Sequence, residues 1–346
     1  MYTKDIQCPY HILQYDALLS RLHGNDPLKA TMTDRYQRAI AGLHGEQSIR
    51  YFLDYLAQKD FSIFHNLRLS DGVHFFQIDW LCLSPRFFLI LEVKNIVGPL
   101  FFNPDAHQLV RKQQGKIEVF DDPDLQALLL TEKLRDWLRN HVGITDYPAD
   151  YRVVLVSAAQ LTFDTPGHRS NQNIIRRAAL GSELLQIDRT YTKRYLSAHK
   201  WQQVTRCLLA KHTPLMLNLF KAYDSLATTN VINGIQCSQC RHFSMKKVFR
   251  GWSCDTCGFF SKDAHIRAFR DYLFIYGNTI TNKQCRKFLR LDSQAVAHRL
   301  LLSVSRHYQG KNRGRVYELS SEQFDKRYDI TNSSQNGLRQ TFSDHF

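Results

Sequence analysis

The sequence predicts an α/β protein with a mixed core in its first half and smaller modules after it. The first observation is that apolar residues recur at helical spacing on either side of three strand-like runs. The second is that two Cys-x2-Cys pairs stand well after this region. The predicted core is therefore a helix, a three-strand meander, a helix and a strand, at residues 42–58, 61–69, 75–84, 87–96, 122–141 and 151–157.

Helical spacing also covers residues 1–40, where Asp26-Pro27 separates two helices. The next helix, residues 42–58, carries an apolar stripe that includes Ile49 and Leu53, and it places Glu46 near its N-terminal turn. Ser70-Asp71-Gly72 and Ser84-Pro85-Arg86 are typical turn sequences, so they join the three strands as a meander.

Two adjacent strand-like segments carry a D-x12-E-x-K pattern made of Asp79, Glu92 and Lys94. Alternate side chains of a strand share a face, so Glu92 and Lys94 project together while Asp79 lies on the neighbouring strand. Carboxylates are ligands for Mg²⁺, which activates water, and an ammonium group can stabilise phosphorane charge. The pattern predicts a metal-dependent phosphodiesterase site.

A surface ion pair is the alternative interpretation of Glu92 and Lys94. Both residues stand within the apolar run FFLILEVKNI. Desolvating a charged pair there costs several kcal/mol unless a metal or other partners compensate. The setting therefore favours a functional role.

The sequence around this pattern resembles the NERD (nuclease-related domain) proteins, which are similar to the PD-(D/E)XK nucleases. The resemblance covers about residues 40–160 and implies a restriction-endonuclease-like core. It also implies that Glu46, Asp79 and Glu92 are metal ligands and that Lys94 is the catalytic lysine. One departure is Ala158-Ala159-Gln160, where an Asn-Pro type turn is expected. The motifs that carry the resemblance are Gly42-Leu43-His44-Gly45-Glu46, Phe64-His65-Asn66-Leu67, Phe76-Gln77-Ile78-Asp79, Leu91-Glu92-Val93-Lys94-Asn95, Gly98 and Asp122-Pro123-Asp124-Leu125-Gln126.

Three glutamines are candidates for contacts behind the metal ligands or with phosphate: Gln77, Gln108 and Gln126. A glutamine amide can orient a water molecule or a ligand carboxylate. Exposed polar surface is the alternative for each of them. Gln126 is favoured because it belongs to the D-P-x-x-Q element of the resemblance.

Cys237-x2-Cys240 and Cys254-x2-Cys257 are separated by 13 residues that predict two short strands around Arg250-Gly251. Two such knuckles suit tetrahedral Zn²⁺ in a zinc ribbon, with a structural role because four thiolates leave no open position. An iron–sulfur cluster also takes four cysteines.

The chain carries a net charge of +14, and this charge is unevenly placed. Residues 1–150 have 16 Lys/Arg and 19 Asp/Glu, whereas residues 151–346 have 30 and 13, a net of +17. Such a basic half predicts binding to a polyanion by neutralising its phosphates. A basic surface that only maintains solubility is the alternative.

Three helical patterns follow the cysteines and end in a basic turn and a strand, an order that resembles a winged helix-turn-helix. Thr281 and Ser293 are suitable N-caps. The third helix, residues 293–308, would be the recognition helix, and the wing would contact phosphates through Lys311, Arg313 and Arg315. A helical cap with a basic surface is the alternative.

These features predict a Mg²⁺-dependent (or Mn²⁺-dependent) nuclease that acts on DNA. The alternative is a nucleic-acid-binding protein that uses a nuclease-like scaffold without turnover. No run of about 18 apolar residues is present and residues 1–11 lack a signal sequence, so we expect a cytoplasmic protein without a membrane partner. The oligomeric state is left open. The expected parts are an N-terminal helical segment (1–40), the nuclease-like core (41–165), a helical connector (166–230), the zinc ribbon (231–261), the winged-helix-like module (262–325) and a flexible tail (326–346).

Overall fold

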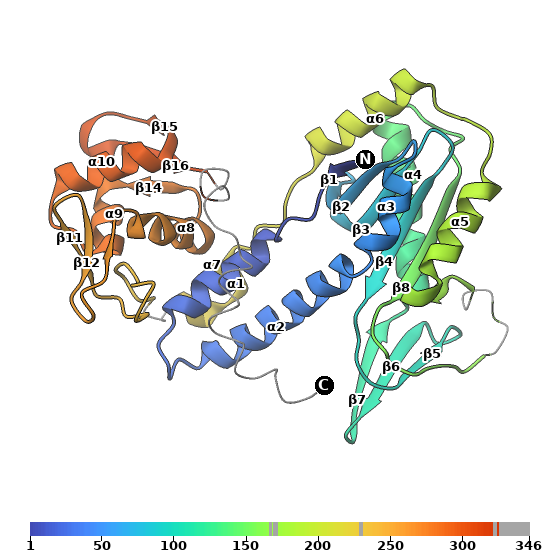
Figure 1. Cartoon of the computed structure of the whole chain (residues 1–346), viewed down its shortest axis with the longest axis horizontal. Helices are drawn as coiled ribbons and strands as arrows, with labels where there is room; N and C mark the ends of the chain where they lie inside the picture. Colours follow the sequence, from blue (N-terminus) through green and yellow to red (C-terminus); the bar gives the residue numbers. More distant parts are fainter. Residues whose placement is uncertain (166–167, 169–171, 228–230, 321–323, 325–346) are drawn as a thin grey trace. The chain divides into compact units, whose positions relative to one another are not determined.

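The chain folds into two compact units that interleave along the sequence (Figure 1). In this computed structural model, all residues are described except 166–167, 169–171, 228–230, 321–323 and 325–346, so the expected tail lies outside the described residues. Unit 1 contains Met1–Pro9 and Gln37–Leu215, and unit 2 contains Tyr10–Tyr36 and Met216–Phe346. The N-terminal helical segment thus belongs mainly with the C-terminal part of the chain.

Unit 1 is built on a six-stranded mixed sheet with the order β1-β2-β3-β4-β8-β10. The predicted meander is present, because β2, β3 and β4 pair in antiparallel fashion. β8 adds to β4 in parallel, with Glu92 opposite Val153. The strands are β1 (Tyr2–Lys4), β2 (Ser62–Ser70), β3 (Phe75–Leu83), β4 (Phe88–Lys94), β8 (Ala149–Leu155) and β10 (Ile174–Arg176).

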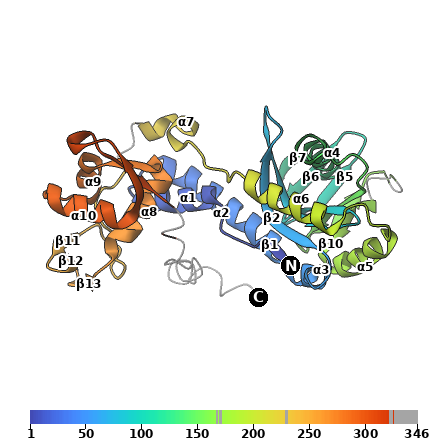
Figure 2. The same cartoon turned by 90° about the horizontal axis from the view of Figure 1, so that it is seen from above.

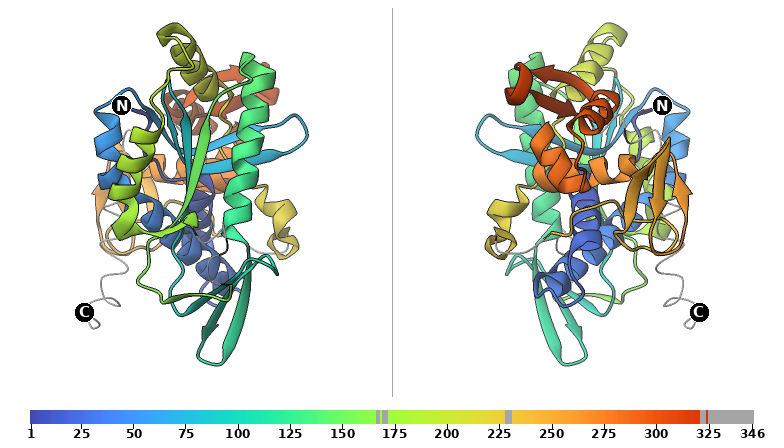
Figure 3. Two further views of the ribbon diagram at one scale, coloured as in Figure 1. Left: turned by 90° about the vertical axis from the view of Figure 1, so that its right-hand side faces the viewer. Right: turned by 90° about the vertical axis from the view of Figure 1, so that its left-hand side faces the viewer.

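Helices cover both faces of this sheet (Figure 3). On one face α4 (Pro123–Val142) and α6 (Ala198–Lys211) pack through residues such as Leu134 and Val204. On the other face α3 (Arg50–Ala57) and α5 (Leu180–Thr190) pack through residues such as Leu53 and Leu184, and the 3-10 turn η2 (Arg177–Ala179) precedes α5. The two longer helices of the expected connector, α5 and α6, therefore lie on the sheet of unit 1.

The capping of α4 follows from its sequence. The Asp122 carboxylate accepts hydrogen bonds from the backbone N–H groups of Asp124 and Leu125, and Pro123 occupies the first turn. Gly143 ends the helix in a left-handed conformation. Gln126 is thereby fixed in the first turns of the helix.

A second sheet, with the order β7-β6-β5-β9, follows β4 in the chain and was not predicted. Its strands are β5 (Leu100–Asn103), β6 (Gln108–Gln113), β7 (Lys116–Asp121) and β9 (Leu161–Phe163). Residues 156–160 lead from β8 into β9, and these include the three residues that depart from the family pattern.

The predicted helix 42–58 is wrong at its start. α2 runs over Leu28–Gln47 and α3 begins at Arg50, so Glu46 lies in the last turn of α2 and not in a first turn. The Ser48 hydroxyl donates a hydrogen bond to the carbonyl of Gly45 at the break. A serine that bonds to the backbone in this way competes with helix continuation.

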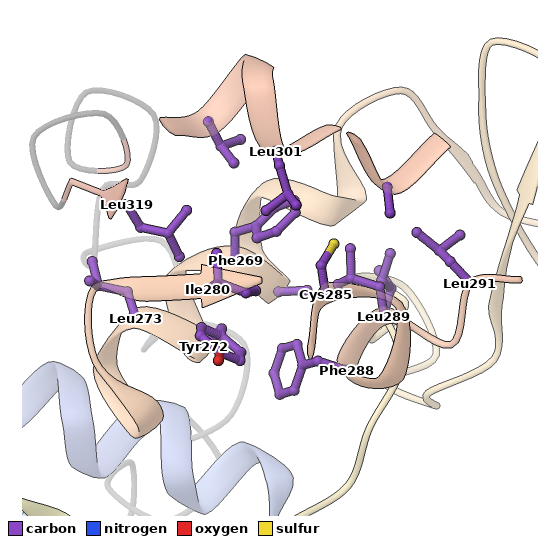
Figure 4. Packing of buried hydrophobic residues seen from close by; sticks show 14 of the residues in the cluster. Phe269, Tyr272, Leu273, Ile280, Cys285, Phe288, Leu289, Leu291, Leu301 and Leu319 are labelled. Carbon is purple, nitrogen blue, oxygen red and sulfur yellow. The ribbon is translucent and has the colours of Figure 1, made fainter. Parts of the chain in front are cut away.

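Unit 2 joins the cysteine-rich segment and the last three helices in one hydrophobic core (Figure 4). Trp252 and Cys254 share this core with Phe269, Phe288 and Leu301. The elements are β11 (Met245–Val248), β12 (Gly251–Cys254) and β13 (Phe260–Ser261) in one sheet, β14 (Thr279–Thr281), β15 (Ser305–Gln309) and β16 (Val316–Leu319) in another, and α8 (Ala264–Tyr276), α9 (Asn282–Leu289), α10 (Gln294–Val304) and the 3-10 turn η4 (Asn312–Gly314).

α1 (Tyr10–Arg21) packs against α8 within unit 2 and carries a fully buried arginine. The Arg21 guanidinium pairs with Asp271 at 2.9 Å and lies 4.4 Å from the centre of the Phe288 ring. It also donates hydrogen bonds to the carbonyls of Ile232 and Gly234. Two short helical segments, α7 (Leu219–Ala222) and η3 (Asp224–Ala227), complete the unit.

The predicted third helix, residues 293–308, is too long. α10 ends at Val304, and the chain then forms β15, which pairs with β16 across the predicted basic turn. Both predicted caps are present: Thr281 forms a capping box with Gln284, and the Ser293 hydroxyl accepts from the N–H of Val296. None of the described helices is long and apolar enough to span a membrane.

Candidate active site and metal centre

The end of β4 carries a buried carboxylate beside an ammonium group. Glu92 is only 4% exposed, and its carboxylate accepts a hydrogen bond of 2.7 Å from the Lys94 Nζ. The same Nζ donates to the Gln126 Oε1 at 2.8 Å, and Gln126 comes from α4. Three of the predicted site residues therefore meet on the side of the sheet that α4 covers.

Asp79 faces this pair from β3. Its carboxylate accepts a 2.9 Å hydrogen bond from the backbone N–H of Val93. Burial raises the pKa of Asp79 well above its ordinary value, and the negative charges of Glu92 and Glu46 add to this effect. Glu92 and Glu46 thus lie close enough to Asp79 for their charges to disfavour its ionisation.

Glu46 reaches the site from the last turn of α2. Its Oε2 lies 2.6 Å from the Nε2 of His65, whose side chain is fully buried on β2. The Trp80 indole donates to the backbone carbonyl of Glu46 and holds the end of the helix against the sheet. His65 belongs to the F-H-N-L motif of the resemblance, but sequence reasoning gave it no role.

Lys4 also lies near Glu46 and was missed. Its Nζ donates a hydrogen bond of 2.6 Å to the His65 carbonyl. Burial lowers the pKa of Lys4 to about 8, while the Glu46 charge opposes this shift. No local pattern indicated this role, because the partner of Lys4 stands 61 residues away.

Gly45 explains part of the G-x-x-G-E motif. A Cβ atom at this position would lie 2.8 Å from the Cβ of Asn95 and 3.2 Å from a methyl of Val156. Asn95, the residue after Lys94, donates through its amide to the carbonyl of Ala41. The glycine therefore allows α2 to approach the end of β4 closely enough to deliver Glu46.

The carboxylate oxygens of Glu46, Asp79 and Glu92 do not all lie within 4.8 Å of one another. Among the described residues, the four cysteines are the one set of three or more His, Cys, Asp or Glu whose ligand atoms lie within 4.8 Å of one another. Glu46 is hydrogen-bonded to His65, and Glu92 accepts a hydrogen bond from Lys94. The carboxylate oxygens nevertheless suit Mg²⁺, because a hard cation takes oxygen ligands and its charge would offset the burial and the neighbouring negative charges that raise the pKa of Asp79.

The other two glutamines are not brought to these groups by any described hydrogen bond. Gln77 lies on β3 opposite Arg68 of β2, two residues before Asp79. Gln108 is exposed at the start of β6 in the second sheet. Of the three candidates, only Gln126 contacts a predicted catalytic residue.

The four cysteines of unit 2 form a compact cluster that can hold a metal. The Sγ atoms of Cys237 and Cys257 are 3.7 Å apart, and those of Cys240 and Cys254 are 3.5 Å apart. β11 and β12 form the predicted hairpin around Arg250 and Gly251, and β13 adds a third strand. The arrangement is compatible with the predicted zinc ribbon.

The predicted wing lies between β15 and β16. Lys311 is exposed, and the Arg315 guanidinium lies 4.5 Å from the centre of the Tyr308 ring. The backbone of Arg313 belongs to η4, but its side chain lies outside the described residues.

A family comparison covers the site formed by the carboxylates and Lys94. Residues 41–156 match the model of the nuclease-related domain, NERD. The NERD match runs from the last turns of α2 to the residue after β8, so it includes Glu46, Asp79, Glu92, Lys94 and Gln126. It ends before the cysteine cluster.

No curated protein matches the chain. Among solved structures, Can2 from Sulfobacillus thermosulfidooxidans in complex with cyclic tetra-adenylate is 14% identical, with a TM-score of 0.26. That comparison covers 51% of this chain and 51% of the Can2 chain. Residues 41–156 are therefore the part of the chain for which a family match was found.

Proposed function

We propose that this protein is a Mg²⁺-dependent nuclease that hydrolyses phosphodiester bonds of DNA, with a PD-(D/E)XK type core. One observation carries the proposal: Asp79, Glu92 and Lys94 meet at one end of two paired strands within the NERD region. Glu46 supplies a third carboxylate from the end of α2. This is the donor set that a hard divalent cation requires.

Each residue has a distinct role in this scheme. Asp79, Glu92 and Glu46 hold the cation, which when bound lowers the pKa of its water and offsets phosphate charge. Lys94 donates hydrogen bonds toward the developing negative charge at the phosphate. Gln126 accepts from the Lys94 Nζ and so fixes its direction from α4.

Unit 2 would serve as the nucleic-acid-holding part. The order α8, β14, α9, α10, β15, β16 supports this proposal, because a winged helix has the same order; α10 would then be the recognition helix and the β15–β16 connection the wing. A structural Zn²⁺ in the cysteine cluster would stabilise the ribbon beside it. Counted by unit, unit 1 has 23 Lys/Arg and 19 Asp/Glu, a net charge of +4, and unit 2 has 23 and 13, a net of +10.

A non-catalytic nucleic-acid-binding protein is the second candidate. The observation that favours it is that the carboxylate oxygens do not converge and that Lys94 is tied to Glu92. In that case the positive charges of both units would bind phosphate while the site stays closed. A cleavage assay on labelled DNA with Mg²⁺, Mn²⁺, Ca²⁺ or no added metal separates the two candidates.

Replacing Lys94 by Met should lower the turnover rate by about 10²- to 10³-fold, as removal of one charge-stabilising donor does. The Mg²⁺ concentration for half-maximal activity should change little, because Lys94 holds no metal in this scheme. The measurement is single-turnover cleavage across a Mg²⁺ titration, with circular dichroism to confirm folding. Lys116→Met, on the exposed end of β7, is the matched control. Unchanged turnover in Lys94→Met would remove Lys94 from the mechanism.

Replacing Lys311, Arg313 and Arg315 together by Ala should make DNA binding less dependent on salt. The log–log slope of affinity against salt should lose about 0.9 for each side chain that contacts a duplex phosphate. Binding is measured without added Mg²⁺ on the full chain. A matched control replaces Lys133 and Arg139 on α4, which are ion-paired within unit 1. An unchanged slope in the triple variant would show that the β15–β16 connection is not a phosphate-binding wing.

A further inference from the structure

The tip of the β11–β12 hairpin presents an exposed aromatic ring beside positive charges. Phe249 is 83% exposed, and the Arg250 guanidinium lies 5.0 Å from the centre of its ring. Arg250 adopts a left-handed conformation, with φ of 58°, at a turn position that glycine or asparagine usually fills.

The hairpin lies beside α10 in two perpendicular views (Figures 1 and 2). The two elements belong to one body, because Met245 and Trp252 of the hairpin share a hydrophobic core with Ala297 and Leu301 of α10. Arg299 is exposed on α10. Burial lowers the pKa of Lys247, and the positive charge of Arg299 lowers it further, so these two cations are close neighbours.

This cluster of cations is not neutralised by ion pairs within the described residues. Lys246 pairs with Asp255 at 2.5 Å, but no described ion pair involves Lys247, Arg250 or Arg299. The Lys247 Nζ is held instead by the carbonyls of Val248 and Gly251. Three cations without a described ion pair around an exposed ring are complementary to a phosphate chain that carries unpaired bases.

We propose that this hairpin tip is a binding site for an unpaired nucleotide of a single-stranded nucleic acid. Phe249 stacks on the base, and Lys247, Arg250 and Arg299 contact the flanking phosphates. The inference rests on the nucleic-acid-binding part of the proposed function and adds to it a preference for strands with exposed bases. Stacking needs no sequence, since every base has an aromatic face.

The charge argues for nucleic acid and against an apolar protein partner at this site. Val248 and Phe260 are also exposed on this sheet, but the hairpin places Lys246, Lys247 and Arg250 among these apolar side chains. An apolar protein segment would gain nothing from burying these cations. Cations on either side of an aromatic ring are typical of surfaces that follow a nucleic-acid backbone and stack its bases.

The test compares binding of the full-length protein to a labelled single-stranded oligonucleotide and to the matching blunt duplex, without added Mg²⁺. Phe249→Ala should weaken single-strand binding about tenfold, the effect expected when one stacked base loses its platform. Duplex affinity and the salt slope should stay unchanged, because phenylalanine neutralises no phosphate. Phe249→Trp should restore single-strand binding. Tyr51→Ala, which removes an 80% exposed aromatic from unit 1, is the control.

Arg250→Ala and Arg299→Ala complete the test. Each should shallow the salt slope on the single strand, by about 0.7 for every phosphate that the arginine neutralises. Unchanged single-strand affinity in Phe249→Ala, or an equal loss on duplex and single strand, would overturn the stacking site. If the wild-type chain binds neither oligonucleotide, the proposed function itself fails, so the two failures are distinguishable.

Discussion

Asp79→Asn should abolish metal-dependent cleavage and, at neutral pH, raise the stability of the protein measured without added Mg²⁺. The cleavage loss follows because the amide no longer supplies an anionic ligand. The stability gain follows because the Asp79 charge is buried near Glu92 and Glu46. The asparagine oxygen can still accept the hydrogen bond from Val93 that Asp79 receives.

The direction of this stability change follows from the coupling between protonation of Asp79 and folding. The pKa of Asp79 is higher in the folded state than in the unfolded state, so the folded state binds this proton more tightly. Its contribution to stability is full below the unfolded pKa and is lost as the pH rises through the folded pKa. Asparagine carries no titrating charge, so the advantage of the variant should grow with pH over that same interval.

Urea unfolding at a series of pH values measures this effect, with and without Mg²⁺. Added Mg²⁺ should stabilise the wild type more than the variant, because ligand binding stabilises only the state that binds it. Asp121→Asn, on the exposed end of β7, is the matched control and should change neither cleavage nor the Mg²⁺ response. Retained cleavage in Asp79→Asn, or a variant less stable than wild type at neutral pH, would contradict the assignment.

Local sequence patterns predicted those parts of the candidate site that depend on strand alternation, turns and helix capping. The alternation of β4 placed Glu92 and Lys94 on one side, and the turns fixed Asp79 on the next strand. Asp122 and Pro123 defined the start of α4, which delivers Gln126. Such features depend on residues a few positions apart, so the sequence contains them directly.

Contacts between distant parts of the chain could not be predicted in the same way. The end of α2, and with it the place of Glu46, depends on a serine hydroxyl and on a close approach to Asn95. His65 gained a partner only when α2 met β2. Arg21 pairs with Asp271, which is 250 residues away, and no local sequence pattern predicts that pairing. β15 became a strand because β16 was available to pair with it.

Removal of the zinc that we propose for the cysteine cluster, or Cys254→Ser, should unfold much of unit 2 and not the ribbon alone. Cys237 and Cys254 are buried in the same core as Trp252, Phe269 and Phe288. Metal binding by such cysteine sites contributes about 10–16 kcal/mol in small zinc peptides. Without the metal, four thiols, of which only those of Cys237 and Cys254 are buried, would have to hold this side of the core.

Hydrogen exchange measures where protection is lost. We expect faster exchange in β11, β12, α8 and α9, weaker nucleic-acid binding, and unchanged protection of β2, β3 and β4 in unit 1. Cys207→Ser, a half-buried thiol on α6 in unit 1, is the control for a cysteine outside the cluster. Elemental analysis should find one zinc per chain in the wild type.

The hydrogen-exchange result distinguishes two possibilities: the metal stabilises the ribbon together with the helices of unit 2, or it stabilises the ribbon alone. Faster exchange in the ribbon, α8 and α9 would show that the metal stabilises the ribbon and the helices together. The hairpin tip would then be held in place beside α10. Exchange confined to residues 237–257 would contradict this, because the helical module would then fold without the metal. Iron with visible absorbance, or no metal at all, would overturn the zinc assignment. In either case the carboxylates that we propose as metal ligands in unit 1 should keep their response to Mg²⁺, since their described hydrogen bonds lie within unit 1.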